Sequence, residues 1–99
     1  MLRYTLSMIR SCADLDTEQV FHHRHSRRYA AFERVAFRKL RQIHRASFVE
    51  ELYAPPGNRL EQLKGNREGQ WSLWINDQFR ICFRWSNGDA YEVEIVDYH

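Results

Sequence analysis

The sequence predicts an α+β fold: a small antiparallel β-sheet of about four strands with two to three helices packed on one face. Two patterns lead to this expectation, because apolar residues recur with helical spacing in the first half of the chain and alternate with polar ones after residue 70. The chain has 99 residues, of which 43% are hydrophobic and 28% are charged. This length and balance fit one compact domain over residues 1–99 and exclude disordered and fibrous classes.

The first half of the chain contains the helical patterns. Asp14 is a suitable N-cap for a short helix over residues 15–21, and a longer helix follows over about residues 27–45. Ser47 and Glu50 match the capping box of a third, short helix. On a helical wheel, the apolar side chains of the longer helix form one narrow stripe, which we expect to face the core. They are Tyr29, Phe32, Ala36, Leu40 and Ile43.

A ridge of arginines lies opposite this stripe on the same wheel. Thirteen of the fifteen basic residues of the chain are arginines, although the net charge is only +2. Arginine favours bidentate contacts with phosphate and stacks on bases. The ridge is therefore expected to contact RNA, while a solvated face and a docking surface for an acidic protein segment are the alternatives. The members of this arginine ridge are Arg27, Arg34, Arg38, Arg41 and Arg45.

Three consecutive antiparallel strands are predicted after residue 70, because apolar residues alternate there with a period of two. To keep the odd-numbered residues on one face, the hairpin loops need an odd number of residues, so three-residue loops are expected at residues 76–78 and 87–89. Residues 8–12 are expected to add a fourth strand. The apolar set that predicts the core face is Trp71, Leu73, Ile75, Phe79, Ile81, Phe83, Trp85, Tyr91, Val93 and Ile95.

The opposite face of this sheet is expected to be more polar. The predicted register places Trp74 across from Arg80, and Arg84 across from Glu92. Trp74 is the tryptophan that the alternation excludes from the core, so it is a candidate platform on which an RNA base stacks. Arg80 could simply be an exposed strand arginine that stacks on Trp74, and this interpretation is the alternative to a catalytic role for Arg80.

Several classes of protein are disfavoured by the sequence. No apolar run approaches the roughly 20 residues of a membrane span, and a secretory signal is lacking, so we expect no membrane association and a cytoplasmic location. Cys12 and Cys82 stand alone, which predicts reduced thiols. The histidines within residues 22–25 flank an arginine, which repels cations, so a polar loop is expected there, with no metal and no cofactor.

Three segments of the second half form a specific combination of motifs. They are PPGNRLEQLKGNREGQWS at residues 55–72, NDQFRICF at 76–83 and VEIVDYH at 93–99. Together they resemble the HigB toxins of bacterial toxin–antitoxin modules, within the RelE/ParE superfamily. The resemblance extends over about residues 8–99, so residues 1–7 are expected to be an N-terminal extension of a single RelE/HigB-like toxin domain.

The resemblance implies the toxin of a type II toxin–antitoxin system. Such a toxin is a ribosome-dependent endoribonuclease, or mRNA interferase, which cleaves translated mRNA in the ribosomal A site without a metal ion. It is held inactive by a HigA-like antitoxin with a helix-turn-helix domain, and it reaches operator DNA only through that antitoxin. The implied fold is RelE-like, in agreement with the α+β pattern described above.

The resemblance also implies a set of catalytic residues. Cleavage of this kind uses the ribose 2'-hydroxyl as nucleophile, so it needs proton transfer and cations at the phosphate. Strict alternation puts Tyr98 on the side of Arg80 but sends Asp97 and His99 to the other side, so a bulge or twist at the strand end is expected if all converge. The matching residues are Arg80 in the strand motif, Asp97, Tyr98 and His99 in the terminal motif, and Lys64 before a glycine.

Each of these residues has an expected role. His99 is the proton donor or acceptor, because imidazole titrates near neutral pH, and Asp97 serves as a base or orients His99. Arg80, assisted by Lys64, stabilises charge on the scissile phosphate. Tyr98 hydrogen-bonds the phosphate or stacks on a base. One branch of the family has a histidine where this chain has Glu61, which is left out of the expected catalytic set.

Two other classes of function remain open from the sequence. The first is a RelE/ParE-like binding module without nuclease activity, which acts through a HigA-like partner on operator DNA or, like ParE, inhibits another target. The second is a general basic RNA-binding domain, which predicts salt-dependent binding without cleavage. The terminal Tyr98 and His99 favour the nuclease, because a pure binding module does not need titratable groups there.

Overall fold

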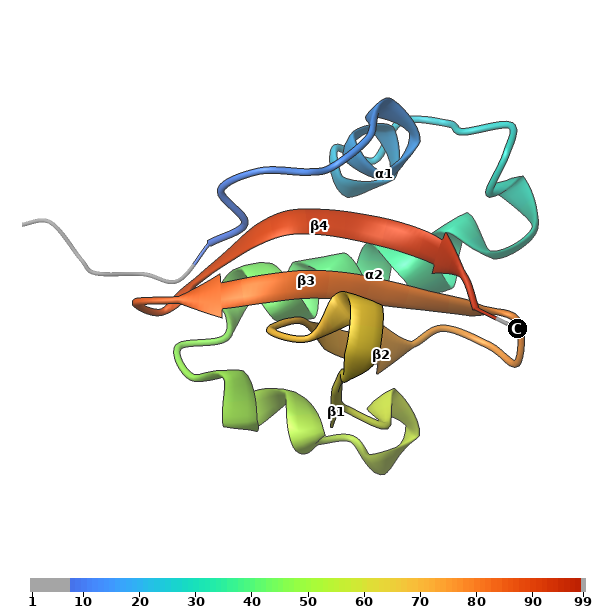
Figure 1. Cartoon of the computed structure of the whole chain (residues 1–99). Coiled ribbons are helices and arrows are strands. Elements are labelled where there is room, and N and C mark those ends of the chain that lie inside the picture. The colour runs from blue at the N-terminus through green and yellow to red at the C-terminus, as the bar shows by residue number, and fades with distance from the viewer. Residues whose placement is uncertain (1–7, 99) are drawn as a thin grey trace, which may run out of the picture.

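The predicted α+β architecture is confirmed in a computed structural model that describes residues 8–98 (Figure 1). Four antiparallel strands form one sheet in the order β1–β2–β3–β4, so strands that follow one another in sequence lie side by side. The predictions made for residues 1–7 and for His99 lie outside the described residues. The strands are β1 (Glu61–Gln62), β2 (Trp71–Trp74), β3 (Phe79–Ser86) and β4 (Asp89–Asp97).

Two α-helices pack with this sheet. α1 (Leu15–Phe21) begins as predicted at Asp14, whose carboxylate accepts the Thr17 N–H at 2.7 Å. α2 (Glu33–Arg45) crosses one face of the sheet, and α1 lies beside β4 (Figure 1). Within residues 8–98, no helix is long and apolar enough to span a membrane. Short 3-10 helices lie at Ala30–Phe32, Val49–Tyr53, Pro56–Asn58 and Gly65–Arg67.

The longer helix begins later than predicted. Residues 27–29 form a bend and a turn, and regular α-helix starts only at Glu33. The hydroxyl of the buried Tyr29 donates to the Ile95 carbonyl at 3.3 Å, and the Glu33 carboxylate accepts the Ser26 N–H at 3.2 Å. These contacts fix the segment before α2 in a non-helical path, so one member of the predicted arginine ridge, Arg27, is not on the helix.

The third short helix also differs from its prediction. It is a 3-10 helix over Val49–Tyr53 without a side-chain cap. The chain enters it through the extended Phe48, so Ser47 precedes the cap position by one residue. The Ser47 N–H therefore donates to the carboxylate of Glu51, at 3.2 Å, and the predicted capping box with Glu50 does not form.

The core lies between α2 and the inner face of the sheet. Four of the five stripe residues are buried, and the fifth, Phe32, packs against the core. Trp71, Phe79 and Trp85 are half-buried against the same cluster, as their odd numbers predict. The alternation is confirmed most clearly at the buried Leu73, Ile75, Ile81, Phe83, Val93 and Ile95.

The first hairpin has the predicted three-residue loop at residues 76–78, because Trp74 pairs with Arg80. The Asn76 side-chain oxygen accepts the N–H groups of Gln78 and Phe79 at 2.9 and 2.8 Å. This turn made by an asparagine side chain holds the loop and keeps the odd-numbered residues of β2 and β3 on the core face.

The second hairpin contradicts its prediction. Ser86 pairs with Asp89, so the loop is a two-residue turn at Asn87 and Gly88. Both turn residues have positive φ, 52° and 82°, as in a type I′ turn, whose twist matches that of the flanking strands. The preferred geometry of a two-residue turn therefore determines the loop length, and next to the turn it places the even-numbered residues of β4, in place of the odd-numbered ones, on the core face.

A β-bulge later in β4 brings the odd-numbered residues back to the core face. Between the pairs Arg84–Tyr91 and Cys82–Glu94, β3 has one residue while β4 has two. Glu92, one of the two, has a left-handed φ of 52°. The bulge shifts β4 by one residue, so its later odd-numbered residues return to the core face.

The register between the turn and the bulge changes two predictions. Ala90, across from Trp85, is fully buried and takes the core place that was predicted for Tyr91. Tyr91 instead lies half-buried across from Arg84. Arg84 is therefore not opposite Glu92, although its Nε still lies 3.3 Å from a Glu92 carboxylate oxygen.

The fourth strand of the sheet is β1 and not the N-terminal segment. Residues 8–12 form only isolated parallel bridges to β4, which join Ile9 to Ala90 and Cys12 to Val93. The Ala90 N–H donates to the Met8 carbonyl at 3.0 Å, so the segment satisfies part of the β4 edge without forming a strand.

Candidate active site and RNA interface

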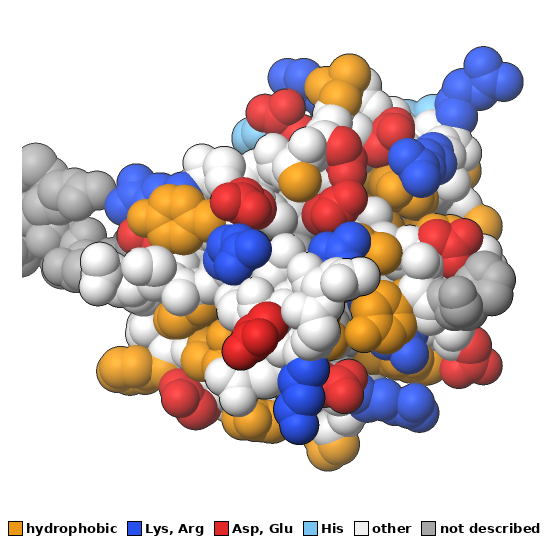
Figure 2. All heavy atoms as spheres, viewed as in Figure 1, with side chains coloured by type: hydrophobic (Ala, Val, Ile, Leu, Met, Phe, Trp, Pro, Cys, Tyr) orange, Lys and Arg blue, Asp and Glu red, His pale blue; other side chains and the backbone are white. Residues whose placement is uncertain are grey.

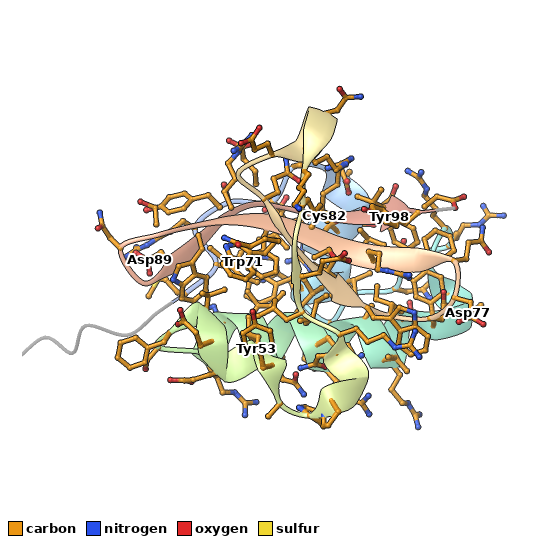
Figure 3. The ribbon with its side chains drawn as sticks, turned by 60° about the horizontal axis from the view of Figure 1, so that its bottom comes forward. Tyr53, Trp71, Asp77, Cys82, Asp89 and Tyr98 are labelled. Atoms are coloured by element: carbon orange, nitrogen blue, oxygen red, sulfur yellow. The ribbon has the colours of Figure 1, made fainter. Side chains whose placement is uncertain are left out.

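Two of the predicted site residues, Arg80 and Tyr98, meet at one end of the sheet. The guanidinium carbon of Arg80 lies 5.3 Å from the centre of the Tyr98 ring, a cation–π contact. The Tyr98 N–H donates to the Gln78 carbonyl at 2.6 Å, which holds this part of the chain against the first hairpin. Figure 3 shows Tyr98 at the same end of the sheet as Asp77, while Asp89 lies at the opposite end.

The main chain fixes the Arg80 guanidinium. Its Nη1 donates to the carbonyls of Asn76 and Phe79, at 2.7 and 3.2 Å. Among residues 8–98, no carboxylate forms an ion pair with Arg80. Arg80 is thus oriented and still has N–H donors for a phosphate. The ring that it contacts is that of Tyr98 and not that of Trp74, which argues against the alternative of a strand arginine stacked on Trp74.

Asp97 lies next to this pair in sequence but not on the same side of the strand. It pairs with Phe79, and the two strands stay in register from Cys82 to this point. The irregularity of this ladder is at Glu92, so no bulge brings Asp97 to the side of Arg80 and Tyr98 between Cys82–Glu94 and Phe79–Asp97. The exposed Asp97 carboxylate accepts the Gln78 side-chain N–H at 3.2 Å.

Lys64 is not brought to this pair. The Leu63 N–H donates to the Gln70 carbonyl at 2.8 Å, so Leu63 lies level with Gln70, just before β2, whereas Arg80 faces Trp74 at the end of β2. Gln70 is four residues from Trp74, about 13 Å of strand at roughly 3.3 Å per residue, and Lys64 follows Leu63 in the direction away from Trp74. Lys64 lines a separate hollow of about 390 Å³ in the connection between β1 and β2.

Four members of the arginine ridge do lie along α2. They line a hollow of about 450 Å³ together with Phe37 and Gln42. The half-buried Phe37 ring stacks on His23, at 4.3 Å between ring centres, and Arg41 lies over the Phe21 ring. The four, which we call the α2 arginines, are Arg34, Arg38, Arg41 and Arg45.

The histidine loop adjoins this surface. His23 and His25 line a second hollow, of about 330 Å³, which shares Arg34 and Phe37 with the first. The carboxylate of Glu33 accepts the backbone N–H of the serine after His25 and contacts His25 Nδ1 at 3.4 Å, and these contacts lower its pKa. Across residues 8–98 the structure brings no three His, Cys, Asp or Glu side chains together as a metal-binding group.

The arginines of this chain fall into two groups. Four of them, Arg10, Arg28, Arg67 and Arg84, lie within 4.0 Å of a carboxylate oxygen. In the described part of the chain, no predicted site cation does so. Figure 2 shows the outer face of the sheet, where acidic and basic side chains are interspersed. Within residues 8–98, the α2 arginines and Arg80 are therefore arginines without a carboxylate at ion-pair distance.

Trp74 is not the open stacking platform that was predicted. The guanidinium carbon of Arg59 lies 4.4 Å from the centre of the indole ring, and Lys39 Nζ lies 5.5 Å from it. Lys39 Nζ also donates to the Trp74 carbonyl at 2.5 Å, and Lys39 is only 5% exposed. Sequence reasoning missed both cations. The helical spacing of Lys39, three residues after Ala36, was a signal for burial, but nothing in the pattern indicated Arg59.

The two cysteines do not contribute a reactive thiol. Both are free, as predicted, and Cys82 is fully buried. Burial raises the pKa of each thiol to about 11, and nearby carboxylates add to this effect. Both thiols are therefore protonated at neutral pH.

A family model described as the RelE-like toxin of the type II toxin-antitoxin system HigB matches residues 12–99. Toxin HigB-1 of Vibrio cholerae serotype O1 is 41% identical over 61 residues, which cover 62% of this chain and 64% of that protein. Endoribonuclease HigB of Proteus vulgaris is 49% identical over 41 residues, which cover 41% of this chain and 45% of that protein.

A third relative, an uncharacterised protein of Haemophilus influenzae, is 29% identical over 66 residues, 65% of its length. The chain thus matches less than two thirds of the length of each of these relatives. The family model, by contrast, includes the strand and terminal motifs and most of the described chain. This chain therefore belongs to the HigB family of RelE-like toxins of type II toxin–antitoxin systems.

Proposed function

We propose that this chain is a ribosome-dependent endoribonuclease that cleaves translated mRNA in the ribosomal A site. The observation that best supports the proposal is the Arg80–Tyr98 pair, in which an oriented guanidinium without a carboxylate partner among residues 8–98 contacts a phenol. The Proteus vulgaris relative is named an endoribonuclease, and we infer the same activity for this chain from its family and from this pair.

In the proposed reaction the ribose 2'-oxygen attacks the adjacent phosphorus while a base removes its proton. The O2'–P bond forms, the P–O5' bond breaks, and the 5'-oxygen takes up a proton, which leaves a 2',3'-cyclic phosphate. Arg80 neutralises charge on the phosphate oxygens, and Tyr98 hydrogen-bonds the phosphate or stacks on a base. Asp97 is the base or orients His99, and His99 donates or accepts the proton.

Lys64 has a more distant role in this proposal. Because at least about 13 Å of strand separates its level from that of Arg80, we assign Lys64 to a neighbouring phosphate of the RNA and not to the scissile one. Its lack of a carboxylate partner in the described chain supports a role as a phosphate ligand.

The proposal includes three partners besides mRNA. The α2 arginines, with Arg27, bind ribosomal RNA, because their charge is not balanced by carboxylates within residues 8–98. A HigA-like antitoxin with a helix-turn-helix domain holds the toxin inactive and connects it to operator DNA. Action on translating ribosomes places the chain in the cytoplasm.

The test is cleavage of a reporter mRNA in a cell-free translation system, with 5' ends mapped by primer extension. The intact chain is expected to cut only mRNA that is being translated. Arg80→Ala and a chain that lacks Tyr98 and His99 are each expected to cut at least about 100-fold more slowly. Arg84→Ala is the matched control, because Arg84 is on the same strand but is paired with Glu92.

Each other outcome contradicts a part of the proposal. Cuts by the intact chain on naked RNA contradict ribosome dependence, and full activity in both site variants contradicts the assigned residues. No cleavage by a folded chain favours the binding module, which acts through the antitoxin without nuclease activity.

A further inference from the structure

Two cations contact Trp74 beside the proposed active site, and a third lies next to one of them on α2. Arg59 and Lys39 both contact the indole ring, and Arg38 is close enough to Lys39 to lower its pKa. In the part of the chain that the structure describes, no carboxylate lies within ion-pair distance of any of them. The cluster is therefore unbalanced positive charge at one point of the molecule.

Lys39 makes this cluster costly to build. Its side chain is 5% exposed, and its ammonium has three N–H donors, but the structure gives it one acceptor, the Trp74 carbonyl. Burial lowers the pKa of Lys39, and the charges of Arg38 and Arg59 lower it further. A buried charge without a counter-ion is rare in proteins, and it is relieved when an anion binds.

The Trp74 ring is also used in an unusual way. Its indole N–H is buried and has no hydrogen-bond partner among residues 8–98, so the ring is not held by a hydrogen bond of its own. What the ring does contact is the Arg59 guanidinium, whose carbon lies over the ring at 4.4 Å from its centre. Stacking uses the faces of the guanidinium plane and leaves its in-plane N–H donors for an anion.

The cluster lies between the two proposed RNA-binding surfaces. Trp74 pairs directly with Arg80 across β2 and β3, so Arg59 stacks on the nearest neighbour of the proposed catalytic arginine. On the other side, Arg38 belongs to the hollow of the α2 arginines. The cluster thus has one contact toward Arg80, through the Trp74–Arg80 pair, and one toward α2, through Lys39.

We propose that Arg59, which lies over the Trp74 ring, together with Lys39 forms a second phosphate site, which binds a backbone phosphate of the substrate RNA next to the scissile one. This site rests on the proposed function, since it deepens the substrate contact of the same protein. Arg59 is the ligand that contacts the phosphate, and Trp74 is a positioning residue. The substrate strand is the occupant, because Trp74, which Arg59 contacts, pairs with Arg80 across β2 and β3.

The experiment measures binding of a short single-stranded RNA with 2'-O-methyl riboses, which cannot be cleaved, by fluorescence anisotropy over a range of salt concentrations. Arg59→Ala is expected to weaken binding several-fold and to reduce the slope of log K against log salt by about 0.7, as for the loss of one phosphate contact. Arg10→Ala is the matched control. It removes the same charge, but from an arginine that is paired with Asp89 at the far end of the sheet.

Two more variants test the role of Trp74. Trp74→Leu removes the flat surface and is expected to weaken binding with little change of the salt slope, because the charge of Arg59 remains. Trp74→Phe restores a ring and is expected to recover most of the affinity. Thermal melting of each variant confirms that it is folded. If Trp74 has only a structural role, Trp74→Leu and Trp74→Phe variants of equal stability bind RNA with equal affinity.

Several results would overturn the site. One is an equal loss of RNA affinity in Arg59→Ala and Arg10→Ala, and another is no RNA binding by the intact chain at low salt. A third is that inorganic phosphate raises the melting temperature only when Arg59 is present, while Arg59→Ala leaves RNA binding unchanged; this result would assign the site to free phosphate. Arg59→Ala that weakens ribosome binding but not binding of the short RNA would assign it to ribosomal RNA. The binding assay uses no ribosome and no cleavage. It therefore tests the phosphate site independently of the proposed nuclease activity.

Discussion

Arg80 owes its orientation to two main-chain carbonyls, and the flat, forked guanidinium is what allows it to bind both and still offer donors. A lysine keeps the charge but not this geometry. Arg80→Lys is therefore expected to slow cleavage about 10- to 100-fold and to lower the free energy of unfolding by about 1 kcal/mol. Cell-free cleavage and urea denaturation measure the two effects. Arg84→Lys is the control, and wild-type cleavage by Arg80→Lys would show that only the charge matters.

The sequence was a good guide to the contact between Arg80 and Tyr98 and a poor guide to its surroundings. Alternation along β3 and β4 put the two on one side, and the structure brings them together. Lys64 was grouped with them through the family resemblance, but the register of β1 with β2 separates it from them. Arg59 was missed because its contact depends on how a 3-10 turn packs beside the end of β2, which no periodic pattern encodes.

At the scale of elements, the turn at Asn87 and Gly88 and the bulge at Glu92 act as a pair. Gly88 has a φ of 82°, which an L-residue adopts at a cost, so Gly88→Ala is expected to lower the free energy of unfolding by about 1 kcal/mol. Gly57→Ala is the control, because an added Cβ there meets nothing within 4 Å and its φ is not left-handed. Urea denaturation compares the two, and equal stability of both variants would contradict a strained type I′ turn.

The same pair shows which part of the fold the sequence could predict. The three strands after residue 70, their order and the first hairpin followed from alternation, since each is a property of contiguous residues, whereas the two-residue β1 was not predicted. A two-residue turn followed by a bulge gives the later part of β4 the same facing as a three-residue turn without one, so the pattern cannot separate them. Only the residues between the turn and the bulge show the difference, because Ala90, and not the predicted Tyr91, lies in the core.

The N-terminal segment is tied to α2 by a histidine. The Ile9 N–H donates to His44 Nδ1 at 3.1 Å, which requires that nitrogen to be unprotonated. Burial lowers the pKa of His44 from 6.5, and Arg41 and Arg45 lower it further. The unfolded chain therefore binds more protons than the folded one between this lowered pKa and 6.5, so stability is expected to fall as pH drops below about 6.5.

Thermal melting at pH 7.5 to 5 tests this expectation, with His44→Gln as the comparison. The variant is expected to lose the part of the pH dependence that His44 causes. Hydrogen exchange gives a local measure, because the amides of Ala90 and Val93 donate to this segment and are expected to lose protection at low pH, relative to the intrinsic exchange rate at each pH. Identical pH profiles of the two proteins would show that the contact between Ile9 and His44 does not depend on protonation.

At the scale of the whole molecule, a net charge of +2 conceals a division of the surface. Paired arginines and their carboxylates lie at the N-terminal segment, between α1 and the turn before α2, and on or beside β3 and β4, whereas the arginines of α2 have no such partners among residues 8–98. Like charges along one helix repel each other, so this arrangement does not serve stability. Its persistence in a small domain is consistent with a polyanionic partner such as RNA.

Two quadruple variants separate charge placement from total charge, since each replaces four arginines with glutamine. Loss of the α2 arginines is expected to reduce the amount of protein that co-sediments with ribosomes and to make this binding less dependent on salt. The free energy of unfolding is expected to stay the same or to rise. Loss of the paired arginines, Arg10, Arg28, Arg67 and Arg84, is expected to lower the free energy of unfolding by about 1 to 3 kcal/mol, because four carboxylates lose partners, and to leave ribosome binding nearly intact. If both variants lose ribosome binding equally, total charge alone governs association and α2 is a solvated face.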